Sequence, residues 1–283
     1  MIRTGVLLAL LAAVAALGGW IYLHPKTHSS APLHLSSLVP GAARKVQIDV
    51  AGKPSIVLEK SATGWRLAAP FAARAETHLV DGVLSIVDAV PRTELPAQHL
   101  DRFGLAQPHA RITIDGRSFA WGNINPVTNE VYVLHAGRVY VLPPRYAAVV
   151  PGGADYLVSR SVLAPDEVPV RFTFPRFEVA LKDGIWRLTP GNAELSEDDL
   201  VRWVDDWRNA SALRAEPYDG PATPTAIDIE LRDGRHLSIG VTEEGGELAF
   251  TRFDEHMRYY LFANSARRLL AAPAAPPPRE HTQ

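Results

Sequence analysis

The sequence predicts an α+β protein: two tandem similar modules after one N-terminal transmembrane helix, each an antiparallel sheet with one amphipathic helix and a short terminal helix. Three observations predict this fold class. The chain begins with an uncharged apolar run, two motifs recur in the same order about 120 residues apart, and alternating segments are joined by links of hairpin length. Such short links leave no room for the crossovers that parallel strands require.

The apolar run covers residues 6–23 and follows a short head in which Arg3 carries the one side-chain positive charge. A helix of these 18 residues is about 27 Å long, close to the thickness of a hydrocarbon core. Trp20 and Tyr22 fall at its outer end, where aromatic rings prefer the membrane interface, and Pro25 ends it. We therefore expect residues 1–24 to be an uncleaved anchor, with the head inside and the ectodomain outside.

A cleaved signal peptide is the alternative for this segment. Ala13-Val14-Ala15 is a small-x-small pattern, and the apolar part of a signal peptide can be short. The run nevertheless continues to Leu23, which favours the anchor.

A comparison of the chain with itself indicates a duplication. The segment from Gly64 to Pro70 recurs from Gly184 to Pro190, and the motif at Asp115-Gly116-Arg117 recurs 118 positions later at Asp233. This period is much longer than that of a solenoid repeat, so the pattern predicts two copies of a whole domain.

Each copy is expected to hold a β-meander, a helix, a second meander and a short closing helix. The first helix carries an apolar stripe from Leu79 to Val90; the second begins at an N-cap, Ser196, and presents Trp203 and Trp207 to the core. Asp-Gly turns are expected to close one hairpin per copy, and Asn264 to cap the last helix. The predicted boundaries are 1–24 anchor, 25–43 polar tether, 44–150 first module, 151–169 linker, 170–271 second module and 272–283 proline-rich disordered tail.

Composition limits the function. The 29 basic and 31 acidic residues give a net charge of −2, so no charge excess would recruit nucleic acid. Cysteine is absent, which excludes disulfides, thiolate metal sites and a cysteine nucleophile.

The residue patterns that could carry chemistry have simpler structural interpretations. The closest histidine cluster lies in the tether, the acidic cluster fits the first turn and the solvated face of a helix, and no serine lies in a nucleophile elbow. The two Trp-Arg pairs at equivalent positions are best explained by core packing, and a ligand at the loop after Gly122 is the weaker interpretation of that loop. We therefore predict no catalytic, cofactor-binding or metal-binding residues. The residues considered were His24, His28, His34, Glu197, Asp198, Asp199, Asp205, Asp206, Ser159, Ser161, Ser211, Gly152-Gly153, Gly245-Gly246, Asn123 to Pro126, Trp65-Arg66 and Trp186-Arg187.

The first module resembles the domain-of-unknown-function 4340 family. The resemblance covers about Val46 to Leu163 and is carried by Gly64 to Pro70, the helix after it, Phe103-Gly104-Leu105 with Pro108, the strand ending at Gly122, and Val131-Tyr132-Val133. Phe103 replaces the tyrosine usual in the family, and Trp121 the usual isoleucine. The resemblance implies an anchored envelope protein, in some cases encoded beside ABC transporter subunits, and it implies no catalytic residue.

Taken together, these observations predict a non-catalytic, single-pass protein of the inner membrane with its ectodomain in the periplasm. We expect it to bind or scaffold a protein partner in an envelope membrane complex, for example a transporter-associated one, and to take no cofactor. The alternative is a periplasmic protein that binds a small ligand or glycan between the modules; a hydrolase assembled from distant residues is a weaker third possibility.

Overall fold

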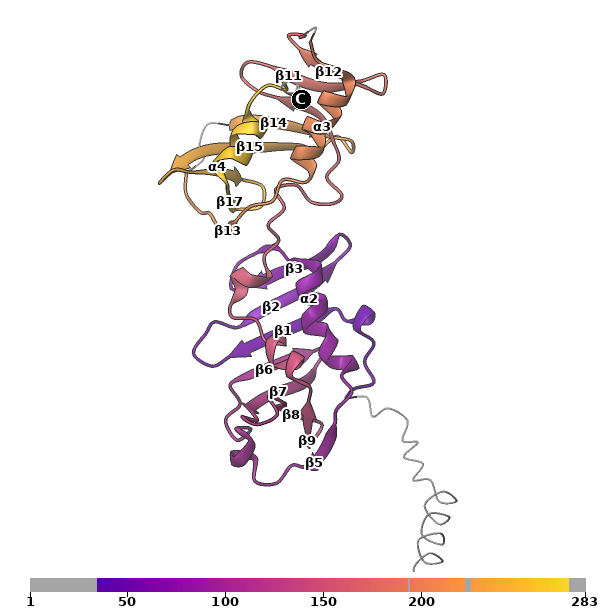
Figure 1. Ribbon diagram of the computed structural model, residues 1–283, viewed down its shortest axis with the longest axis vertical. Helices are drawn as coiled ribbons and strands as arrows, with labels where there is room; N and C mark the ends of the chain where they lie inside the picture. Colours follow the sequence, from indigo (N-terminus) through magenta and orange to yellow (C-terminus); the bar gives the residue numbers. More distant parts are fainter. Residues whose placement is uncertain (1–34, 193, 222–224, 275–283) are drawn as a thin grey trace, which may run out of the picture. The chain divides into compact units, whose positions relative to one another are not determined.

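The structure, a computed structural model, describes residues 35–192, 194–221 and 225–274 (Figure 1). The predicted anchor, residues 25–34 of the predicted tether and most of the predicted tail lie outside these residues. The rest of the predicted tether, residues 35–43, belongs to the fold: Leu35 and Ala43 are buried, and residues Pro40–Ala42 form the 3₁₀ helix η1. Among the helices of the described ranges, none is long and apolar enough to cross a membrane.

The described residues form two antiparallel sheets with a few helices, which confirms the α+β class. The first sheet has the strand order β4-β3-β2-β1-β6-β7-β8-β9-β5, and the second β12-β11-β10-β14-β15-β16-β17-β13. The strands of the first are β1 (Lys45–Val50), β2 (Ile56–Ser61), β3 (Gly64–Ala69), β4 (Ala73–Arg74), β5 (Thr93–Pro96), β6 (Ala110–Ile114), β7 (Arg117–Ile124), β8 (Val131–His135) and β9 (Arg138–Leu142). Those of the second are β10 (Pro169–Thr173), β11 (Glu178–Lys182), β12 (Ile185–Thr189), β13 (Arg214–Pro217), β14 (Thr225–Leu231), β15 (His236–Glu244), β16 (Glu247–Arg252) and β17 (Met257–Leu261).

Apart from β4, the two sheets correspond strand for strand. In both, the order along the sheet is third, second and first strand of the leading meander, then the four strands of the second meander, then the strand that directly follows the helix. The recurring sequence motifs predict two similar modules, and the shared order agrees with that prediction.

In both sheets the connection through the main helix runs from one edge to the other. Helix α2 (Thr77–Leu84), continued by the 3₁₀ turn η2 (Ser85–Asp88), leads from the β3–β4 edge to β5, and α3 (Glu197–Arg208) leads from β12 to β13. Each helix buries its apolar side, which in α3 consists of Leu200, Trp203, Val204 and Trp207. The first helix is shorter than its apolar stripe suggests, because the stripe continues into the 3₁₀ turn.

The caps of the second module's helices follow the prediction in one case and contradict it in the other. At α3 the Ser196 side chain accepts from the Asp199 amide and the Asp199 side chain accepts from the Ser196 amide, a complete capping box. At α4 (Ala263–Leu270) the N-cap is Phe262 without a side-chain hydrogen bond, so the prediction of an Asn264 cap is wrong. The N-cap lies two residues earlier than predicted, because β17 ends at Leu261 and leads into the helix almost directly.

The edge strands β5 and β13 were not predicted from the sequence. Each has four residues, includes a glutamate and ends in proline, so neither shows the alternation of a half-buried strand. Short edge strands with charge and proline are a common protection against further strand pairing. The pairing with β9 and β17 that defines them is visible only in three dimensions.

The two Asp-Gly hairpins differ in their turns. Asp115 and Gly116 both have positive φ, as a two-residue turn of type I′ requires. In the second copy only Gly234 does, and the loop is longer, with Glu230 paired to His236. The Asp233 side chain there accepts hydrogen bonds from the backbone and side chain of Arg235, which fixes the wider loop.

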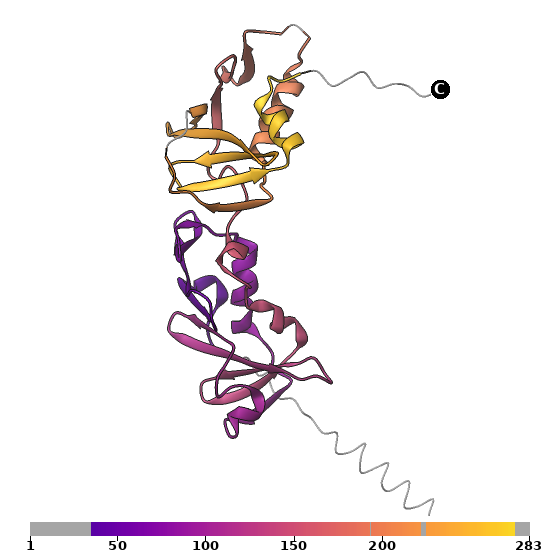
Figure 2. The same cartoon turned by 90° about the vertical axis from the view of Figure 1, so that its left-hand side faces the viewer.

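The core of the second module is rich in aromatic rings. Phe172 lies within 5.6 Å of the ring centres of both Trp203 and Trp207, and Phe250 stacks on Trp207. The indole nitrogens of the two tryptophans donate to the carbonyls of Ala271 and Leu269, so α3 also fixes the end of α4. The two helices lie side by side in Figure 2.

The predicted linker, residues 151–169, is part of the folded structure. Leu157, Val158, Val162 and Leu163 are buried. Val158 pairs with Ala75 and Ser161 with Ser211, so the linker bonds to residues of both sequence copies.

Candidate functional site

The residues considered from the sequence are dispersed and mostly have structural roles. Asp199 closes the capping box, with Glu197 and Asp198 in the same first turn. Asn125 accepts from the amides of Val127 and Thr128 and so holds the loop after β7. The histidine cluster at 24, 28 and 34 lies outside the described residues.

Core packing holds for Trp65, which is buried. Trp186 is only partly buried and packs against the core beside Phe172, at 6.3 Å between ring centres. The second copy of the motif thus leaves more of its tryptophan accessible.

A cluster of charged residues lies where the linker meets the second sheet, and the sequence patterns did not indicate it. Its centre is Arg252, at the end of β16, whose side chain is 0% exposed. Arg252 donates to both oxygens of Glu167, at 2.8 and 3.0 Å, to both oxygens of Asp254, at 2.8 and 2.9 Å, and to the carbonyl of Val162. All five N–H groups of this guanidinium therefore have a partner.

Arg74 of β4, in the first sheet, contacts the same cluster. Its Nε donates to Oε1 of Glu255 at 2.7 Å, and its Nη2 donates to the carbonyl of Ser161 and contacts the Tyr259 hydroxyl at 3.0 Å. The Tyr259 hydroxyl in turn donates to Glu255 at 2.7 Å. Nη1 of Arg74 is buried and has no hydrogen-bond partner among the described residues.

The electrostatics of this cluster favour permanently charged groups. Burial raises the pKa of Glu167, but its hydrogen bonds and ion pair with Arg252 outweigh burial and hold the pKa below its usual range. Asp254 behaves in the same way, and burial together with Glu255 raises the pKa of Tyr259, so its hydroxyl stays protonated. These shifts move the pKa values of Glu167, Asp254 and Tyr259 away from neutrality, whereas a general base needs a pKa near neutrality.

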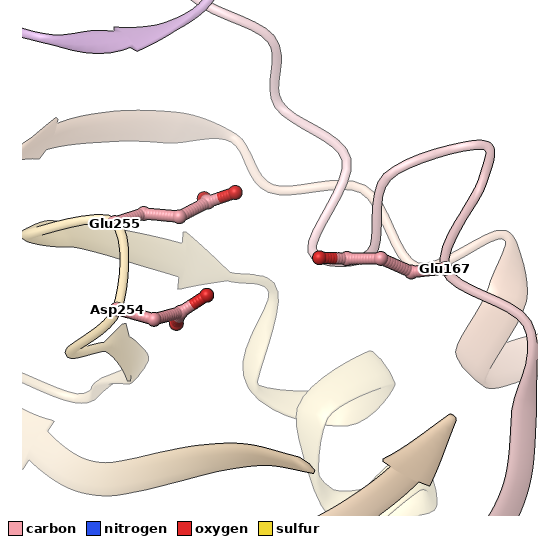
Figure 3. A group of neighbouring side chains, drawn as sticks. All are labelled: Glu167, Asp254 and Glu255. Atoms are coloured by element: carbon pink, nitrogen blue, oxygen red, sulfur yellow. The ribbon is translucent and has the colours of Figure 1, made fainter. Parts of the chain in front are cut away.

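Three carboxylates of the cluster have the spacing of a metal site. Oxygens of Glu167, Asp254 and Glu255 lie within 4.8 Å of one another and their side chains point toward a common space (Figure 3). The cations that occupy this arrangement are the guanidinium groups, since Arg252 bonds to Glu167 and Asp254 and Arg74 bonds to Glu255. A metal ion would have to displace a fully buried arginine, so we interpret the cluster as an ion-pair network that ties the linker to both β4 and β16.

A pocket beside this network is small. It measures about 100 Å³ and is lined by residues of β3, β4 and the linker, including Arg74, Glu76, Ser159 and Ser161. The oxygen Oε2 of Glu76 accepts from the Ser159 hydroxyl at 3.2 Å. Ligand sites are generally larger, about 300–1,000 Å³, so this position does not fit a sugar or a metabolite well.

An open apolar pocket of about 650 Å³ lies in the second module. The turn between β10 and β11 supplies Phe174 and Phe177, whose rings stack with centres 4.3 Å apart. The end of β12 supplies Leu188 and Pro190, and the segment after α4 forms another wall with residues 270–273. Arg176 and Asn192 are the polar side chains of the lining.

Trp203 connects the walls of this apolar pocket. Its ring lies 5.9 Å from Phe174 and 6.2 Å from Phe177, in edge-to-face contact with both, while its Nε1 donates to the carbonyl of Ala271 at 3.2 Å. Because one buried side chain holds both the aromatic wall and the C-terminal wall, the pocket has a defined shape.

Sequence reasoning found Trp203 but not the pocket. The signal in the sequence is the aromatic pair of Phe174-Pro175-Arg176-Phe177, a pattern that the ends of two strands explain equally well. The contribution of residues 270–273 could not be anticipated, since it depends on how α4 packs on α3.

Comparison with known proteins adds no family to this description. No protein-family model, no curated protein and no solved structure matches the chain.

Proposed function

We propose that this chain is a membrane-anchored extracytoplasmic protein that binds a segment of a protein partner in an envelope membrane complex and catalyses no reaction. The observation that carries the proposal is the open apolar pocket framed by Phe174, Phe177, Leu188 and Pro190. Phe177 is partly exposed and stacks on the buried Phe174, with Arg176 beside them. A partly exposed aromatic ring beside an arginine is a common feature of protein docking sites.

We do not assign the functional site to the charged network. Its carboxylates are paired with two arginines and its tyrosine is hydrogen-bonded to Glu255, so these groups satisfy one another's charges and hydrogen bonds. Pairing at the edge strands β5 and β13 is a weaker route to a partner, because both end in proline and carry glutamate.

The location in the envelope is supported by the apolar residues 6–23 and by the resemblance of residues 46–163 to the domain-of-unknown-function 4340 family. An association with a transporter rests on that resemblance. Because the chain has no cysteine, a single introduced cysteine can report its side of the membrane. Val127→Cys, at a side chain that is 86% exposed, should react with a membrane-impermeant maleimide in cells whose outer membrane has been permeabilised. Labelling only after lysis of the inner membrane would contradict the proposed orientation.

Site-specific photocrosslinking tests the docking proposal. A photoreactive amino acid in place of Phe177, in the full-length chain in its native membranes, should give a discrete protein adduct on illumination. The matched control replaces Phe262, which is 63% exposed and does not line the pocket. No adduct at position 177, or the same adducts at both positions, would count against the pocket as the docking site.

The second candidate function is binding of a small apolar ligand in the same pocket. The pocket volume of about 650 Å³ favours this function, because it lies in the usual range for ligand sites. Native mass spectrometry of the purified full-length chain distinguishes the two. A bound small molecule that is lost in Phe177→Ala would support the ligand, and an unmodified mass together with the crosslinked adduct would support the protein partner.

A further inference from the structure

Strand β12 forms one edge of the second sheet and lacks the protection found at β5 and β13 (Figure 1). Its five residues, Ile185–Thr189, include no proline and no acidic residue, and three of them are β-branched or aromatic. In the described residues no strand pairs with its outer side. An unprotected edge of this kind is able to accept a further strand.

The first module shows that this outer position can hold a strand. There β4 pairs with β3, the equivalent of β12, and the Ala75 amide donates to the Trp65 carbonyl at 2.9 Å. Val158 of the linker then pairs with Ala75. In the second module the described residues between β12 and α3 form no strand, so none of them takes the place of β4.

The backbone groups that β12 offers to an added strand belong to Trp186 and Leu188. The strand follows a two-residue turn, Asp183-Gly184, in which both residues have positive φ, and residues that flank such a turn bond to each other. Ile185 therefore bonds to β11. Because the bonding direction alternates along an antiparallel strand, Arg187 also bonds to β11, whereas Trp186 and Leu188 direct their N–H and C=O groups outward. The equivalent tryptophan of β3 does the same in the first module.

We propose that β12 receives an extended segment of the protein partner as an added antiparallel strand, with an acidic residue opposite Arg187 and an apolar residue on each side of that acid. The direction follows from β4, which runs antiparallel to β3. Arg187 is exposed and has no ion pair within the described ranges, and opposite charges directly across a strand pair stabilise it. Trp186 and Leu188 lie on the other face of β12 and pack against the core, so apolar residues fit opposite them.

The added strand continues into the apolar pocket. Leu188 lines the pocket from β12, and Pro190 and Asn192 extend that wall. Arg176 of the lining is a second cation that forms no ion pair with a described residue, which favours a further acid in the segment. This inference rests on the proposed function and deepens it, since it gives the conformation and the charge pattern of the segment that docks.

A second copy of this chain fits the edge less well than a different protein. The longest pairing of two β12 strands uses all five residues and places Arg187 opposite the same residue of the other copy. Because that pair is not hydrogen-bonded, its Cα atoms lie about 4.5 Å apart, and like charges directly opposite each other destabilise a strand pair. The charge of the edge therefore favours an acidic strand from another protein.

Photocrosslinking along β12, with the full-length chain in its native membranes, tests the added strand. A photoreactive amino acid in place of Ile185, which is 38% exposed and does not line the pocket, should give the same partner adduct as one in place of Phe177. The matched control replaces Val201 of α3, which is 39% exposed and should give no such adduct.

The crosslinking outcomes separate this inference from the proposed function. An adduct at Phe177 without one at Ile185 overturns the added strand and leaves docking in the pocket supported. An adduct at Ile185 alone supports the strand and counts against the pocket, and the absence of adducts at both positions counts against both proposals. The same adduct at Val201, or an adduct with twice the mass of the chain, overturns the proposed occupant of β12.

Charge reversal tests the acid opposite Arg187. Arg187→Glu should lower the yield of the adduct at position 185 about fivefold, and Arg187→Lys, which keeps the charge, should retain most of the yield. Arg66→Glu, at the equivalent exposed position of β3, is the control and should change nothing, because β4 already pairs with that strand. An unchanged yield in Arg187→Glu, or an equal loss in Arg66→Glu, would contradict the proposed pairing.

Hydrogen exchange resolved to single amides tests the backbone pairing. In the purified full-length chain the Arg187 amide should exchange slowly, because it bonds to β11, and the amides of Trp186 and Leu188 should exchange rapidly. In the purified adduct formed at position 185, the latter two amides should exchange about tenfold more slowly or less. Rapid exchange of both amides in the adduct, or slow exchange of both in the free chain, overturns strand addition.

Discussion

The Nε of Arg74 lies 2.7 Å from Oε1 of Glu255, a residue 181 positions further along the chain. Both side chains are largely buried, with 12% and 10% of their surfaces exposed. Arg74 donates to the linker carbonyl of Ser161 and Arg252 to that of Val162, while Glu255 and Glu167 pair with these two arginines. The linker is therefore fixed by charge-assisted hydrogen bonds and not only by apolar contacts.

Loss of Arg74 should destabilise the protein strongly. Arg74→Met removes the cation and leaves Glu255 buried without that partner, which typically costs about 3–5 kcal/mol. Urea unfolding of the full-length chain in detergent measures the effect. Lys45→Met, in an exposed pair with Glu59, is the control and should change stability by about 0.5 kcal/mol or less. Equal effects of the two substitutions would contradict a structural role for the network.

Stability should fall at acid pH because of Glu167. Its pKa is lower in the folded protein than its ordinary value of 4.5, so its contribution is fully present above 4.5 and is lost as the pH falls through the lower folded value. Glu167→Gln should flatten the acid side of a plot of stability against pH. An unchanged slope in this variant would show that Glu167 is not the residue responsible.

Two glycines should respond in opposite directions to alanine. A Cβ on Gly122 would lie 2.1 Å from the Phe103 carbonyl oxygen, so Gly122→Ala should cost about 2 kcal/mol or more. Gly82 lies in α2 with nothing within 4 Å of an added Cβ, and Gly82→Ala should stabilise by about 0.5–1 kcal/mol. Thermal unfolding of both variants beside the parent chain checks the pair. A Gly122→Ala variant as stable as the parent would contradict the close contact with Phe103, and a destabilised Gly82→Ala would contradict the open space beside Gly82.

The two helix starts of the second module should also differ. Ser196→Ala breaks the capping box of α3 and should cost about 1 kcal/mol. Asn264→Ala removes no cap, since α4 begins without one, and should stay within about 0.5 kcal/mol of the parent. Chemical denaturation distinguishes these values. A larger loss of stability for Asn264→Ala would indicate that the Asn264 side chain caps α4 after all.

Trp203 should matter for both stability and docking. Trp203→Phe keeps an aromatic ring but loses the hydrogen bond to Ala271, so we expect a loss of about 1–2 kcal/mol. It should also reduce the photocrosslinked adduct at position 177, because the C-terminal wall of the pocket is no longer fixed. Stability loss without any change in the yield of that adduct would separate Trp203 from the pocket.

The sequence by itself determined the α+β class, the capping box at Ser196, and the strands and helices whose residues alternate or repeat with a clear period, because hydrophobic period and turn chemistry are local properties. It also carried the expectation of an anchor at residues 6–23, which lie outside the described structure. Only the tertiary structure decided the edge strands β5 and β13, the Arg74–Glu255 pair and the pocket of Phe174, Phe177 and residues 270–273. The physical reason is that an edge strand is defined by its neighbour, a buried charge by a partner far along the chain, and a pocket by the packing of elements that share no sequence pattern.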